Sequence, residues 1–229
     1  MKIKAKPMKY KSKGRGKKFQ RTYKPQRTLA LSGFPNSKIV RLRYAESIGL
    51  NPVITGNGFY VFRANSIFDP NFTGVGHQPM GHDEWALSYN HYSVLGSKIK
   101  VTFCSTDTTY TNAACVCSVS RQADSTAIAI SSGTRLQESG APYKILGTPN
   151  SSNGQVVLTS YFSAKKHLKT GSTNFPFNRA SFGTNPSEEI YYHITMSPLD
   201  ASQDLAVIYF YVEIDYVCLL SERRTLSVS

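Results

Sequence analysis

Residues 206–219 place the strongest constraint on the fold, because apolar side chains recur there at every second position. Successive side chains of a strand point to opposite faces, so this alternation predicts a long β-strand with one buried face. A membrane-spanning helix is not expected, since the apolar stretch 205–220 is too short and contains Glu213 and Asp215. The predicted buried face consists of Ile208, Phe210, Val212, Ile214, Tyr216 and Cys218.

Most of the remaining signals are also those of strands. Residues 39–44, 58–65, 96–103, 114–120, 155–162 and 190–196 are further strand candidates, separated by long turn-rich loops. The best helix candidate is 83–92, with Asp83 as the cap and Trp85, Tyr89 and Tyr92 on the packed side; 134–138 is weaker. The pattern predicts an all-β chain: a single eight-stranded jelly roll of two packed four-stranded antiparallel sheets, with one short helix.

In a jelly roll the first, third and last strands share a sheet, and the last lies between the other two. The candidates are 39–44, 96–103 and 206–219. Two interpretations of their polar faces follow. The four cations line an inner wall that meets nucleic acid, or the two acids pair with two of them, which we favour. These side chains are Arg41, Arg43, Lys98, Lys100, Glu213 and Asp215.

Charge divides the chain unevenly. Residues 1–27 contain nine Lys, three Arg and no acid, whereas the other 202 residues carry 15 basic and 14 acidic side chains. Such a segment cannot bury enough apolar surface to order itself, so 1–32 is predicted to be a disordered basic arm and 33–229 the folded domain. No secretory signal is expected, because 1–27 lacks an apolar run.

Cations interleaved with aromatic side chains suit a single-stranded nucleic acid, whose phosphates attract the cations and whose bases stack. Residues 13–18 also resemble a nuclear-import signal. The predicted nucleic-acid-binding residues are Lys2, Lys4, Lys6, Lys9, Lys11, Lys13, Arg15, Lys17, Lys18, Arg21, Lys24, Arg27, Lys98 and Lys100.

Catalytic and metal patterns are weak. His77 and His82 lack a third ligand at metal spacing, and Cys115 and Cys117 fit one face of a strand without a second pair. We therefore expect no enzyme activity, no cofactor and no metal, with reduced cysteines packed in the core. A metal-dependent enzyme of the cupin type would need a cluster of ligands on strands, and the strands offer only His193.

Residues 62–103 carry a long ordered motif. It runs R-A-N-S-I-F-D-P at 63–70, G-V-G-H-Q-P at 74–79, D-E-W at 83–85 and Y-S-V-L-G-S-K-I at 92–99. This stretch resembles the capsid proteins of small circular single-stranded DNA viruses of the circovirus-like group that encode a replication initiator.

The resemblance implies a coat protein that assembles with copies of itself, about sixty, into a small icosahedral T=1 shell around single-stranded DNA (RNA is not excluded). It also implies a virion location, passage through host nucleus and cytoplasm with host import machinery, an unknown host receptor and no membrane insertion. Self-association is expected through aromatic loops that contain Phe68, Phe72, Phe175, Phe177 and Phe182. The alternative is a cellular or ribosomal nucleic-acid-binding protein with a basic tail.

Overall fold

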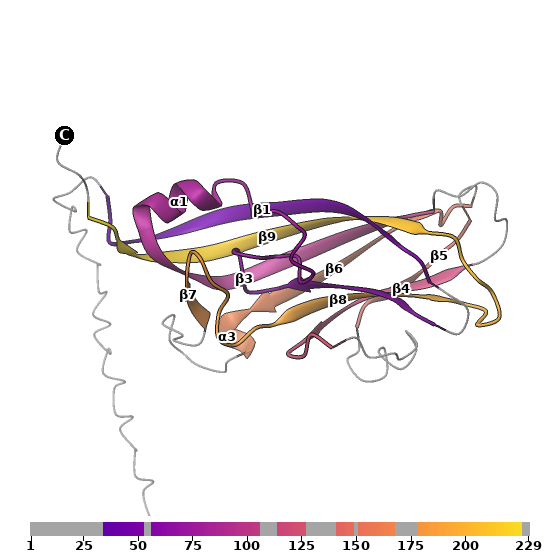
Figure 1. Cartoon of the computed structure of the whole chain (residues 1–229). Coiled ribbons are helices and arrows are strands. Elements are labelled where there is room, and N and C mark those ends of the chain that lie inside the picture. The colour runs from indigo at the N-terminus through magenta and orange to yellow at the C-terminus, as the bar shows by residue number, and fades with distance from the viewer. Residues whose placement is uncertain are drawn as a thin grey trace, which may run out of the picture. The chain divides into compact units, whose positions relative to one another are not determined.

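Two antiparallel sheets face each other in the computed structural model (Figure 1). It describes residues 34–52, 56–105, 114–126, 141–148, 151–167 and 178–225. One sheet has the order β1-β9-β3-β6 with β7 also pairing with β3, and the other has the order β2-β8-β4-β5. The strands are β1 (Ser37–Leu50), β2 (Gly58–Arg63), β3 (Tyr89–Cys104), β4 (Cys115–Gln122), β5 (Tyr143–Leu146), β6 (Gln155–Ser163), β7 (Arg179–Ser181), β8 (Tyr191–Pro198) and β9 (Ile208–Arg223). The predicted all-β jelly roll is confirmed, with nine strands among the described residues, in sheets of five and four, in place of two sheets of four.

The core lies between the two sheets and follows the predicted alternation. On β9 every second side chain from Ile208 to Leu220 is buried, and on β3 Ile99, Val101 and Phe103 are fully buried. The central strand β9 pairs with β1 on one side and β3 on the other, as the sequence predicted. This pairing fixes the face on which each charged side chain of the three strands lies.

The predicted helix 83–92 is only partly correct. Helix α1 spans His82–Ser88, its N-cap is Gly81 with φ 85°, and no side chain caps it. Asp83 is therefore inside the first turn, where its carboxylate lies 2.9 Å from His82 Nδ1. Tyr89 and Tyr92 belong to β3 and are fully buried, because pairing with β9 extends the strand into the end of the helical pattern.

Two short strands, β5 and β7, were not predicted. Both consist of three or four residues with little alternation, so their pairing depends on neighbours distant in sequence. A second short helix, α3 (Ala164–His167), follows β6 directly. The weaker helix prediction at 134–138 lies outside the described residues.

The cysteines behave as expected of core residues. Cys115, Cys117 and Cys218 are buried, Cys104 is half-buried, and all four are free. Burial raises the pKa of the Cys218 thiol well above its ordinary value.

The aromatic loop prediction is partly wrong. Phe182 is buried in the subunit's own core and is therefore not available for self-association, whereas Phe68 is half-buried and packs against that core. Phe72 is exposed, with its ring edge-on to Tyr191. Phe175 and Phe177 lie outside the described residues.

Candidate nucleic-acid interface

The outward face of the five-stranded sheet gathers the cations of the folded domain that the sequence singled out. Arg43 of β1 and Lys98 of β3 both lie opposite Asp215 of the central strand β9. One step along, Lys100 lies opposite Glu213. Alternation along three neighbouring strands places these side chains on one surface, away from the core.

Both acids are paired. Asp215 accepts two hydrogen bonds from Arg43, at 2.6 Å from Nε and 3.1 Å from Nη2, and this interaction raises the pKa of the Arg43 guanidinium. Glu213 accepts from Lys100 Nζ at 2.7 Å. The interpretation that the acids neutralise two of the four cations is confirmed. Lys100, which the sequence predicted as a nucleic-acid-binding residue, is therefore already paired with a carboxylate.

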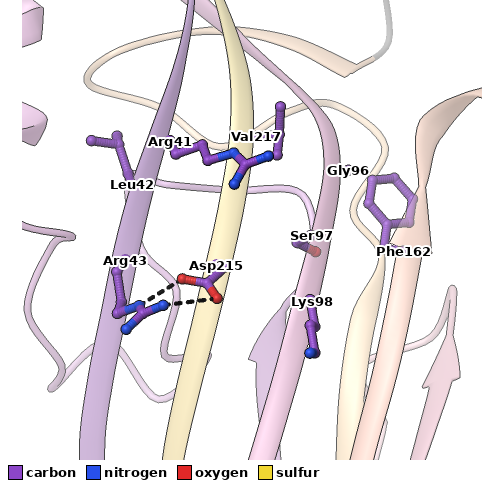
Figure 2. A pocket seen from close by; sticks show the side chains of 9 residues that line it. All are labelled: Arg41, Leu42, Arg43, Gly96, Ser97, Lys98, Phe162, Asp215 and Val217. Atoms are coloured by element: carbon purple, nitrogen blue, oxygen red, sulfur yellow. Dashed lines mark hydrogen bonds and ion pairs between the residues drawn. The ribbon is translucent and has the colours of Figure 1, made fainter.

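Arg41 and Lys98 remain available for an external anion. Arg41 makes no ion pair or hydrogen bond with any residue that the structure describes, and Lys98 Nζ lies 5.5 Å from the ring centroid of Tyr161. Figure 2 shows Arg41 extending across β9 toward Val217, with Lys98 beyond Asp215 on the neighbouring strand. The sequence placed Arg41 on this face but did not include it among the predicted nucleic-acid-binding residues.

A pocket of about 550 Å³ opens between these cations (Figure 2). Its lining includes Arg41, Arg43 and Lys98 but one acid, Asp215, so the surface favours an anion. Gly96 and Val217 face each other across the strands and leave its floor apolar. The residues that line the pocket are Arg41, Leu42, Arg43, Gly96, Ser97, Lys98, Phe162, Asp215 and Val217.

Gly96 keeps this part of the sheet open. The register between β3 and β9 shifts between Val94 and Gly96, and a Cβ on Gly96 would lie 3.0 Å from the Phe162 carbonyl oxygen of β6. A larger residue would push β6 away from β3. The absence of a side chain at Gly96 therefore preserves both the strand pairing and the room beside Lys98.

Exposed aromatic rings continue the same face. Tyr161 on β6 and Tyr209 and Tyr211 on β9 are about half exposed, and Tyr211 lies opposite Thr102, which is two residues beyond Lys100. Exposed rings can stack on unpaired bases, while cations attract phosphates. The face thus presents cations and aromatic rings together, the two kinds of side chain that suit a single-stranded nucleic acid.

The motif of residues 63–70 has a structural role in this subunit. Arg63 is buried and forms ion pairs with Asp69 and Glu189. Asn65 donates to Asn178 Oδ1 and to the Glu188 carbonyl oxygen. The motif therefore holds the loop after β2 against the segment before β8, and its arginine does not face the cationic surface.

The described ranges contain no group of three or more His, Cys, Asp or Glu side chains that could hold a metal. His82 is buried beside Phe182, and His77 stacks on Tyr44 at 4.6 Å between ring centroids. His193 Nε2 lies 2.6 Å from the Asp124 carbonyl oxygen.

Among the described residues, no helix has the length and apolar character needed to cross a membrane.

The twelve cations nominated in 1–27 lie outside the described residues. Their contribution to binding stays a prediction, and the candidate interface within the described residues is the sheet face alone.

Solved structures of viral capsids resemble this chain, at low sequence identity. No protein-family model matches the chain, and no curated protein matches it. The BFDV capsid protein in its 60-mer is 13% identical, with a TM-score of 0.45, covering 86% of this chain and 100% of that chain. Empty-head turnip yellow mosaic virus is 8% identical, with a TM-score of 0.45, covering 88% of this chain and 89% of that chain. Mud crab tombus-like virus is 14% identical, with a TM-score of 0.45, covering 87% and 96%. Because these identities and TM-scores are low, the assignment of the jelly roll depends on the strand pairing of this chain itself.

Proposed function

We propose that this protein is a viral capsid protein that self-assembles into a small icosahedral shell and packages single-stranded DNA through its basic N-terminal arm. The jelly-roll architecture and the motif of residues 62–103 support the shell role. The observation that carries the proposal is the separation of charge: twelve cations without an acid in 1–27, beside 15 basic and 14 acidic residues in the remainder.

This separation suits the two tasks of a coat protein. A nearly neutral domain can pack against copies of itself with little repulsion, while a polycationic arm neutralises a genome at many phosphates without reading its sequence. A cellular or ribosomal binding protein needs no such division, because nothing requires its folded domain to self-associate.

We further propose that the outward face of the five-stranded sheet lines the inside of the shell and meets the genome through Arg41 and Lys98. Neither side chain forms an ion pair with a carboxylate of the described residues, and both line the pocket, which supports this assignment. Tyr161 supplies a ring beside Lys98 on which a base can stack. Lys100 contributes less, because Glu213 already neutralises it.

The finer features remain part of the proposal. The resemblance in the sequence implies a shell of about sixty copies. It also implies that host import machinery carries the protein into the nucleus through the arm, and that the virion binds a host receptor. No enzyme activity and no cofactor belong to this function.

The decisive experiment is electron microscopy of the purified full-length protein together with its absorbance ratio at 260 and 280 nm. Closed particles that contain nucleic acid are expected. Deletion of residues 1–27 should leave particles that have lost most of that nucleic acid. A soluble monomer that binds nucleic acid would instead favour the cellular or ribosomal alternative, and full packaging by the truncated protein would contradict the role of the arm.

The contribution of the sheet can be separated from that of the arm. Arg41→Ala with Lys98→Ala should weaken binding of a single-stranded oligonucleotide and reduce the slope of log K against log salt by about 1.4, for two lost phosphate contacts at about 0.7 each. The control is Lys100→Ala, which removes a cation that is already paired. Equal slopes for the double variant and the wild type would reject the inner-wall assignment.

A further inference from the structure

The segment before and within α1 covers an edge of the five-stranded sheet. Strand β1 is the last strand on that side, so half of its backbone groups could pair with another chain. His77 Nε2 lies 3.0 Å from the Ala45 carbonyl oxygen, and Lys38 Nζ lies 4.7 Å from the centroid of the Trp85 ring. Figure 1 shows α1 beside β1. Edge-to-edge strand pairing is therefore hindered here, and a neighbour that approaches this part of the edge meets the outer surface of this segment.

That outer surface is apolar and acidic. Met80 is 90% exposed and Leu87 is 77% exposed, although both are large apolar side chains. Asp83 and Glu84 are exposed and lie four and three residues before Leu87, so they share its side of the helix. We call Met80, Asp83, Glu84 and Leu87 the α1 surface. Trp85 faces the other way and packs against the core.

The opposite edge of the same sheet carries the opposite charge. Strand β6 lies at the far end of the order β1-β9-β3-β6, and α3 continues directly from it. Ala164 is buried and anchors α3, whereas Lys165 and Lys166 are exposed. No described residue forms an ion pair with either lysine. We call Lys165 and Lys166 the α3 surface.

Charge complementarity between the two edges identifies the occupant as a second copy of the chain. We propose that the α1 surface of one subunit docks against the α3 surface of the next, in a head-to-tail contact that repeats around a ring. An isologous contact would bring acid to acid or lysine to lysine, whereas a heterologous contact pairs acid with lysine and can close into a ring. The proposal rests on the self-assembly proposed above and names the surfaces that mediate it.

Charge reversal in the full-length protein tests this contact. Asp83→Lys with Glu84→Lys should raise the concentration needed for half-maximal assembly about tenfold, and Lys165→Glu with Lys166→Glu should do the same, since each places like charges together. The four changes combined should restore assembly, because the pairs are re-formed with the signs exchanged. Particles are counted by electron microscopy and smaller species by sedimentation velocity.

Two further variants separate the proposed contact from a general effect of charge reversal and from loss of folding. Lys144→Glu with Asp204→Lys reverses exposed charges outside both surfaces and should assemble like the wild type. Leu87→Ser removes an exposed apolar side chain without a change of charge, so it should weaken assembly while leaving the melting temperature unchanged. Thermal melting of every variant confirms that the subunit is folded.

The outcomes separate this contact from the function. The α1–α3 contact would be overturned if both charge-reversed variants assembled like the wild type, or if the variant with all four changes did not regain assembly. Either result would leave the capsid proposal standing. A wild-type protein that stays monomeric at every concentration would overturn both.

Discussion

Arg63 offers the sharpest test of whether the shared motif serves the fold or a ligand. Its guanidinium is 9% exposed and forms ion pairs with Asp69, at 2.8 Å, and with Glu189. It also donates to the Asp69 carbonyl oxygen at 3.0 Å and lies 4.9 Å from the centroid of the Phe72 ring. Arg63→Met removes the charge but keeps much of the packing, and leaves two carboxylates facing each other.

The expected loss in the free energy of unfolding follows from the burial of the Arg63 ion pairs. Removing one partner of a buried ion pair costs about 3–5 kcal/mol, because the remaining charge stays desolvated. Here Asp69 and Glu189 retain 26% and 22% side-chain exposure, so water solvates them in part and the loss should fall near the lower end, about 3 kcal/mol. The triple variant Arg63→Met, Asp69→Asn, Glu189→Gln should recover part of that loss, since no unpaired charge remains.

The assay is urea unfolding of unassembled protein, followed by the fluorescence of the single tryptophan. A lower midpoint with an unchanged slope is expected, which means lower stability without a different unfolded state. A loss below about 1 kcal/mol would refute the buried-pair argument. Unchanged stability with weaker nucleic-acid binding would assign Arg63 to a ligand instead.

Three further predictions concern single contacts. A double-mutant cycle of Arg43→Ala with Asp215→Ala should show a small coupling in melting temperature that high salt abolishes, because the pair is exposed; strictly additive effects at low salt would contradict the pairing. Trp85→Ala should destabilise by roughly 2 kcal/mol, about half of what a fully buried tryptophan costs, because this ring is only partly buried; wild-type melting would place it outside the core. Hydrogen bonding from Arg179 lowers the pKa of Glu222, so that carboxylate stabilises the fold above its unfolded pKa and the contribution disappears as pH falls through the folded pKa. Glu222→Gln should therefore melt earlier than wild type near about pH 7 and equally once the carboxylate is protonated; a constant difference at all pH values would contradict this.

The sequence predicted the fold class because alternation is a local property. The buried face of β9 can be seen in the spacing of Ile208 to Cys218, and the strand order of a jelly roll predicted that β9 lies between β1 and β3. The same reasoning indicated that acids would neutralise two of the four cations. It could not say which two, because that depends on register, and a shift of one residue would move Asp215 to the other face.

Other features depended on contacts between distant segments. The sequence of 83–92 suits a helix throughout, yet pairing of Tyr89 and Tyr92 with β9 makes the second part a strand. Strand β5 has no clear pattern of its own and forms because β4 supplies hydrogen-bonding partners.

Tertiary structure also decided which charged residues are available. Nothing near Arg63 in the sequence shows that it pairs with Glu189, because that acid lies 126 residues away. Arg41 lies opposite Val217 and so has no acid directly across the sheet, and Asp215, which lies between Arg43 and Lys98, pairs with Arg43. Periodicity fixes which face of a strand is buried, since it needs only the chain's own geometry; pairing energies depend on distances between side chains that only the folded chain brings together.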